Sequence, residues 1–131
     1  MEVAVAGPEG ANRLFTVAGQ FDPQLSVRGS ERSVEKKETF TVLIGPTLTR
    51  QQFFRAISTA SLVKTDVVIL SAGEPFSQGF GWGIVGTDAD WDDESKQVEL
   101  RIEVFAAVSG RENTVQIGGL AFQVMILAAV V

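Results

Sequence analysis

The strongest constraint on the fold is a strict alternation of apolar and polar side chains over residues 96–108. The apolar positions are Val98, Leu100, Ile102, Val104 and Ala106, and the polar positions are Gln97, Glu99, Arg101 and Glu103. A period of two residues is the spacing of a β-strand with one buried face and one solvated face. This segment therefore predicts an antiparallel sheet, in which half-buried strands are common.

The last strand-like segment, residues 114–131, is apolar on both sides in its second half, from Leu120 onward. One side carries Leu120, Phe122, Val124 and Ile126, and the other carries Ala121, Met125 and Leu127, with Gln123 as the one polar interruption. A strand of a β-sandwich normally meets the core with one side and water with the other. Both sides of this strand need cover, so we expect either a helix or a second copy of the chain to lie over it.

A short helix is predicted after Gly45 and Pro46. Thr49 and Gln52 have the spacing of a capping box, in which each side chain bonds the backbone N–H of the other residue. Apolar residues then recur at helical spacing, namely Phe53, Ala56, Ile57 and Ala60. We expect a helix over about residues 50–61 that packs this apolar stripe against a sheet.

The rest of the chain contains further strand-like segments separated by Gly, Pro and charged turns. Its length of 131 residues is typical of one domain, and no repeat or change in composition divides it. The predicted fold class is therefore mainly β, with a single domain over residues 1–131. We expect an antiparallel β-sandwich or barrel of about eight strands with the one short helix, and we predict no strand order.

The composition excludes several classes of chemistry. The chain has no His, no Cys and no Tyr, so it lacks the usual general base, the usual metal ligand and any thiol nucleophile. Catalysis would depend on carboxylates, on a lysine of shifted pKa or on a bound cofactor, so a non-catalytic protein is the preferred interpretation and an enzyme is the alternative. A formal net charge of −5 repels a phosphate backbone, so nucleic acid is not an expected partner.

Neither end of the sequence carries a targeting or membrane signal. The opening residues, MEVAVAGPEG, lack the basic and apolar regions of a signal peptide. The apolar segment 117–131 is shorter than the roughly 20 residues that a membrane-spanning helix needs. We expect no membrane span and, by default, a cytoplasmic protein.

An acidic segment has the spacing of a calcium loop. Asp88, Asp90 and Asp92 occupy the first, third and fifth positions, and Glu99 occupies the twelfth. The sixth position, where such a loop needs glycine for its sharp turn, is Asp93, and the flanking segments are strand-like. A solvated acidic turn is the preferred interpretation, and a Ca²⁺ site on the four spaced carboxylates is the alternative. No other cofactor is expected.

Aromatic residues are concentrated on either side of the acidic segment. They are Phe76, Phe80, Trp82 and Trp91. Aromatic walls with a few polar groups are typical of small-molecule pockets, so residues 76–93 are a candidate site for a small ligand or a glycan. Burial in the core is the competing interpretation, because large aromatic side chains mostly bury.

Three functions follow from these patterns, in order of preference. The first is a non-catalytic interaction or assembly module that is homo-oligomeric, with a second copy of the chain as the expected partner. Its basis is a mean hydropathy of +0.19 with 45% hydrophobic residues, and its predicted interface is Phe122, Val124 and Ile126. The second is a small-ligand or carbohydrate-binding domain that uses residues 76–93, and the third is a carboxylate-based hydrolase.

Overall fold

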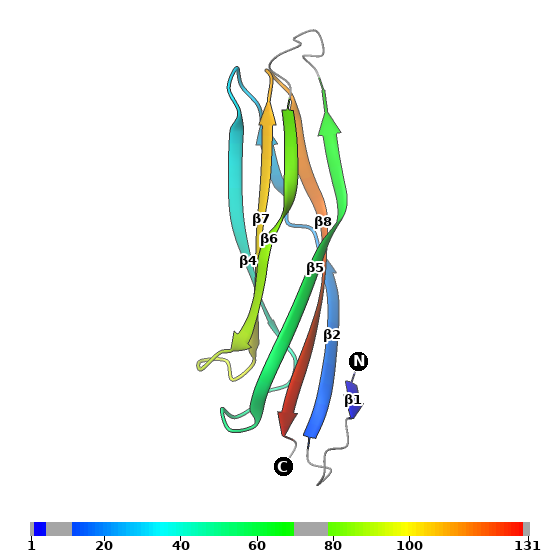
Figure 1. The fold of residues 1–131 in the computed structure, drawn as a ribbon, viewed down its shortest axis with the longest axis vertical. Helices are drawn as coiled ribbons and strands as arrows, with labels where there is room; N and C mark the ends of the chain where they lie inside the picture. Colours follow the sequence, from blue (N-terminus) through cyan, green and yellow to red (C-terminus); the bar gives the residue numbers. More distant parts are fainter. Residues whose placement is uncertain (1, 5–11, 70–78, 130–131) are drawn as a thin grey trace.

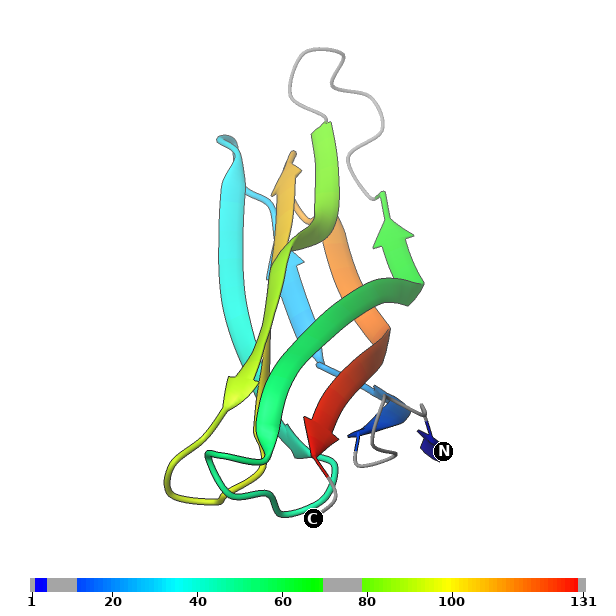
Figure 2. The same cartoon turned by 60° about the horizontal axis from the view of Figure 1, so that its bottom comes forward.

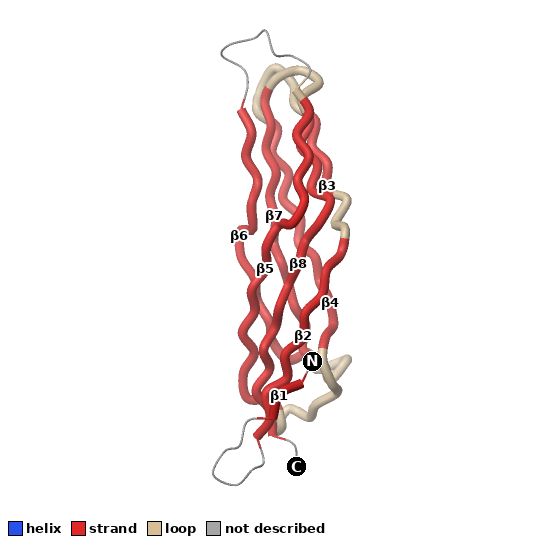
Figure 3. Tube along the Cα trace, turned by 90° about the vertical axis from the view of Figure 1, so that its right-hand side faces the viewer, coloured by secondary structure: helices blue, strands red, loops and turns tan. Residues whose placement is uncertain are grey.

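The computed structural model describes residues 2–4, 12–69 and 79–129, which form an elongated arrangement of two antiparallel sheets (Figure 1). The strands are β1 (Glu2–Ala4), β2 (Asn12–Phe21), β3 (Leu25–Arg28), β4 (Val34–Ile44), β5 (Phe53–Val68), β6 (Gly79–Trp91), β7 (Val98–Ser109) and β8 (Thr114–Ala129). The mainly β class is thus confirmed. The described residues contain no helix, and hence none that could cross a membrane (Figure 3).

The larger sheet is built around β8. On one side β8 pairs with β5, and on the other side it pairs first with β3 and then with β2, which in turn pairs with β1. The smaller sheet has the order β4-β7-β6. No strand pairing joins the two sheets within the described residues, so they do not form one closed sheet.

The core lies between the two central strands, β7 and β8. These strands supply twelve of the sixteen buried hydrophobic residues that the described part of the chain contains. They are Val98, Leu100, Ile102, Val104, Ala106 and Val108 from β7, and Val115, Ile117, Leu120, Val124, Ile126 and Ala128 from β8. The predicted alternation along residues 96–108 is confirmed, because the other face of β7 is partly or fully exposed.

The two sheets are also joined along their sides. Where β5 passes β6, the Ser58 hydroxyl donates to Thr87 Oγ1 at 2.9 Å, and the Thr87 hydroxyl is 3.2 Å from the Ser58 carbonyl oxygen. On the opposite side, the rings of Phe21 and Phe40 meet edge to face with their centroids 5.5 Å apart. These contacts fix the lateral position of one sheet over the other.

The predicted helix over residues 50–61 is wrong, although its capping box forms. Thr49 N donates to Gln52 Oε1 at 2.8 Å, and Gln52 N donates to Thr49 Oγ1 at 3.3 Å. The turn ends there, and β5 begins at Phe53. The four-residue interval between Ala56 and Ala60 equals about one helical turn and also two strand repeats, so it does not distinguish the two structures. Pairing with β8 along the whole of β5 satisfies the backbone groups, and the strand is the result.

Gly119 marks a close approach between β5 and β8. A Cβ at this position would lie 2.7 Å from Val63 Cγ2 and 3.2 Å from Lys64 Cβ. The first distance is shorter than real Cβ contacts, so Val63 would have to move. The register of β5 shifts at the same level, on either side of Lys64. Such irregularities bend a strand and increase its twist, and β5 curves across β8 in Figure 2.

The core predicts a large difference between two leucine substitutions. Leu100 is fully buried in β7, whereas Leu43 in β4 is 47% exposed. Leu100→Ala should lower the free energy of unfolding by about 2–5 kcal/mol, because it leaves a cavity, and Leu43→Ala should change it by less than about 1 kcal/mol. Urea denaturation at one protein concentration measures both, and equal losses would contradict the assignment of β7 as the centre of the core.

Candidate functional site

The predicted aromatic cluster does not assemble into one platform. Phe76 lies outside the described residues. Phe80 and Trp82 lie in the first part of β6, whereas Trp91 is its last residue. Trp82 and Trp91 are nine positions apart along the extended strand, a span of about 30 Å. Of the candidate ligand site over residues 76–93, the surroundings of Trp91 are therefore the part that the described residues allow us to analyse.

The predicted calcium ligands do line one small hollow, together with an arginine. A cavity of about 180 Å³ is bordered by Asp88, Asp90, Trp91, Asp92, Glu99 and Arg101. The register places Asp88 opposite Arg101, and Arg101 Nε donates to Glu99 Oε1 at 2.7 Å. The described residues contain no group of three or more His, Cys, Asp or Glu side chains arranged to hold a metal ion. The Ca²⁺ site stays a prediction. The positive charge of Arg101 already lies among the carboxylates that would bind the ion.

Asp92 shapes the turn between β6 and β7. Its carboxylate accepts hydrogen bonds from Ser95 Oγ at 2.7 Å and from Ser95 N at 2.9 Å. These bonds favour the ionised form and hold the pKa of Asp92 below its ordinary value. The turn is closed by Lys96 N, which donates to the Asp92 carbonyl oxygen at 2.8 Å, and Lys96 itself has a φ of 61°. The Asp92 carboxylate therefore has a local structural role.

Trp91 is the centre of the best-formed concave site with both aromatic and polar walls. Its indole Nε1 donates to the carbonyl oxygen of buried Leu48 at 2.9 Å, which fixes the orientation of the ring. The Lys96 ammonium lies 5.2 Å from the ring centroid and 3.0 Å from Asp93 Oδ1. Two turns, residues 45–52 and 92–97, thus meet at Trp91, at the lower end of the molecule (Figure 2).

Two hollows adjoin at this tryptophan. The first, of about 490 Å³, is lined by Thr47, Leu48, Thr49, Arg50, Gln51, Gln52, Trp91, Asp93 and Lys96. The second, of about 460 Å³, is lined by Arg50, Phe53, Asp90, Trp91 and Asp93. The sequence pattern identified Trp91 but missed residues 47–53 as lining, because residues 50–53 were assigned to the start of a helix and Thr49 to its cap. The capping-box pair Thr49 and Gln52 was the signal that a turn lies there.

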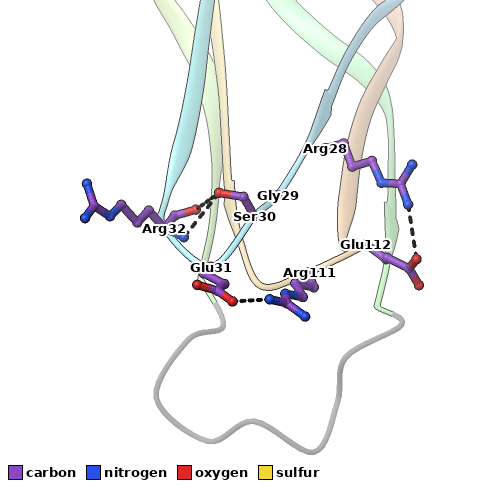
Figure 4. Close-up of a pocket in the computed structure, with 7 residues that line it drawn as sticks. All are labelled: Arg28, Gly29, Ser30, Glu31, Arg32, Arg111 and Glu112. Atoms are coloured by element: carbon purple, nitrogen blue, oxygen red, sulfur yellow. Dashed lines mark hydrogen bonds and ion pairs between the residues drawn. The ribbon is translucent and has the colours of Figure 1, made fainter.

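A larger hollow lies at the opposite end and is formed by ion pairs (Figure 4). It has a volume of about 830 Å³ and is lined by Arg28, Gly29, Ser30, Glu31, Arg32, Arg111 and Glu112. Arg28 pairs with Glu112 at 3.3 Å, and Arg111 pairs with Glu31. All four side chains are more than half exposed, and such surface pairs contribute at most about 1 kcal/mol. This end is a solvated charged turn.

The predicted interface residues face inward. Val124 and Ile126 have no exposed surface, and Phe122 is partly buried against the same core. The opposite side of β8 is the accessible one. We call it, with the matching sides of β2 and β5, the outer face of the larger sheet. Residues directly opposite in antiparallel strands share a face, so its members are Leu14, Thr16, Ala18, Gln20, Arg55, Ile57, Thr59, Ser61, Ala121, Gln123, Met125 and Leu127.

Comparison of the chain with protein-family models, with curated proteins and with solved structures finds no match.

The Asp92 turn predicts a defined pH response. Since the folded-state pKa of Asp92 is lowered, its ionised form stabilises the fold above about pH 4, and this contribution is lost as the pH falls through the folded-state pKa. Ser95→Ala removes the hydroxyl donor and should raise the pKa of Asp92 towards its ordinary value. Carboxyl NMR titration of the wild type and of the variant measures the shift. An unchanged Asp92 titration in the variant would refute the role of Ser95.

Proposed function

We propose that this chain is a non-catalytic β-sandwich module that assembles with copies of itself through the outer face of its larger sheet. The observation that carries this proposal is the unequal distribution of charge between the two outer faces. The composition supports the non-catalytic part, since the chain has no His and no Cys for general-base or thiol chemistry.

The outer face of the larger sheet is almost uncharged. Of these twelve positions, only Arg55 carries a charge, and it lies at one corner, opposite Leu127. A further charge on this side of β5 is Asp66, which lies beyond the twelve positions, opposite Gln116. Ile57 is 52% exposed and its cross-strand neighbour Met125 is 38% exposed. Apolar side chains exposed together on one face are typical of protein interaction surfaces.

The outer face of the smaller sheet has the opposite character. The corresponding twelve positions are Lys37, Thr39, Thr41, Leu43, Gly83, Gly86, Asp88, Asp90, Glu99, Arg101, Glu103 and Phe105, of which six are charged. The whole chain carries a net charge of −5, so two copies repel each other in most orientations. The uncharged face of the larger sheet is where two copies approach at the lowest electrostatic cost.

The shape of this face suits a two-fold interface. Ile57 and Met125 form a ridge, and the small residues Ala18, Ser61 and Ala121 border a hollow of about 350 Å³. Met125 and Ala121 are four residues apart on one strand, a distance of about 13 Å. In a two-fold dimer the same patch serves both subunits, so the ridge of each copy would enter the hollow of the other.

The alternative was that a helix of the same chain covers the second apolar side of β8, and the structure contains no such helix among the described residues. The segment that was expected to lie over the strand as a helix is β5, which pairs with β8 edge to edge in the same sheet. An edge-to-edge neighbour covers neither side of a strand. The core takes one side of β8, and we propose that a second copy covers the exposed part of the other side, around Met125.

Self-association should therefore depend on Ile57. We expect the wild-type chain to be a dimer or larger assembly at micromolar concentration. Ile57→Glu places like charges on both sides of the interface and should weaken association at least about tenfold, equivalent to about 1.4 kcal/mol. Sedimentation velocity over a concentration series measures the change.

The matched control is Leu43→Glu, which adds the same charge at a similarly exposed position (47%) on the charged outer face. It should leave association unchanged, and circular dichroism verifies that both variants remain folded. A wild-type chain that stays monomeric at high concentration, or equal effects of the two variants, would refute the proposed interface.

A further inference from the structure

We propose that the depression around Trp91 is a binding site for an uncharged saccharide. The site lies at the end of the molecule where the 45–52 and 92–97 turns meet, and it shares no residue with the outer face of the larger sheet. The inference therefore stands independently of self-association.

The aromatic wall is preorganised. The Trp91 ring is held by the hydrogen bond from its indole N–H to the Leu48 carbonyl oxygen, and Leu48 is only 5% exposed. Phe53 adds a second, partly buried aromatic wall in the adjoining hollow. A ring that is fixed before the ligand arrives loses little conformational entropy on binding. The part of the ring that Lys96 does not cover suits the C–H groups of a sugar ring.

The charges around the depression favour an uncharged ligand. Arg50 and Lys96 contribute two positive charges, and Asp90 and Asp93 contribute two negative charges. An anionic ligand such as a phosphate would meet the two carboxylates, and a cation would meet the arginine and the lysine. A polyhydroxyl ligand, in contrast, uses donors and acceptors of both signs, because each hydroxyl group can donate and accept.

Some side chains on the rim of the depression already have a hydrogen-bond or ion-pair partner within the protein, and others are exposed to solvent. Lys96 is paired with Asp93, and the Gln52 side chain accepts a bond from Thr49 N. Arg50 and Gln51 are exposed and line the same hollow, so their donors are directed at solvent or ligand. The volumes of about 490 and 460 Å³ lie within the usual range for small-molecule pockets, roughly 300–1,000 Å³.

The two tryptophans provide a built-in test by NMR. The chain contains Trp82 and Trp91 only, and Trp82 lies far along β6 from the depression. Glucose, galactose, mannose and N-acetylglucosamine are titrated separately to about 100 mM, which detects the millimolar affinity of weak sugar sites. At least one sugar should cause saturable shifts of the Trp91 indole resonance and of the 47–53 backbone, and the Trp82 indole should not move.

Arg50→Ala should weaken this binding at least fivefold, whereas Arg32→Ala, at the opposite end of the molecule, should not. Both arginines are exposed, so neither change threatens the core. The sugar titrations are repeated with the Ile57→Glu variant. Sugar binding is thereby measured separately from self-association. Absence of saturable Trp91 shifts with all four sugars, or equal binding by Arg50→Ala and wild type, would overturn the proposal.

Discussion

Packing between β7 and β8 is the interaction on which the rest of the structure depends. Each is the central strand of its sheet, and together they supply most of the buried apolar residues of the described chain. Every other element is attached to one of these two strands by hydrogen bonding, directly or through β2. The contact therefore sets the distance between the sheets, and strand register then decides which side chains lie on each outer face.

Register explains why charge is divided so unevenly between the two surfaces. Along β7, alternate residues that face away from the core are Glu99, Arg101 and Glu103, and β6 adds Asp88 and Asp90 beside them. Along β8, the equivalent positions are apolar or uncharged, and the residues opposite them on β2 and β5 are uncharged except Arg55 and Asp66. A slip of one residue in either central strand would exchange core and surface residues, so burial of the core enforces the surface pattern as well.

A sequence pattern predicted the structure correctly where it was compatible with one type of secondary structure and one choice of buried face. Residues 96–108 have a charged face that cannot be buried, so both the strand and its inner side were predictable. In β8 both sides are apolar, and the choice of Val124 and Ile126 as interface residues could not be made from the pattern, because the opposing sheet determines which side is core. The spacing of Ala56 and Ala60 fits two periods, and long-range pairing with β8 decided between them. The depression at Trp91 could not be foreseen, since it joins turns more than 40 residues apart in sequence.

The place of β8 in chain order has a consequence for folding kinetics. The strands of the smaller sheet, β4, β6 and β7, all precede β8, whereas β2, β3 and β5 obtain their central partner only when β8 arrives. Asn12 must then find Ala129, a closure over most of the chain, and such long-range pairing is slow. During synthesis the edges of three strands stay unpaired until the centre of their sheet exists, which makes this interval the one in which the chain is most exposed to aggregation and most in need of a chaperone.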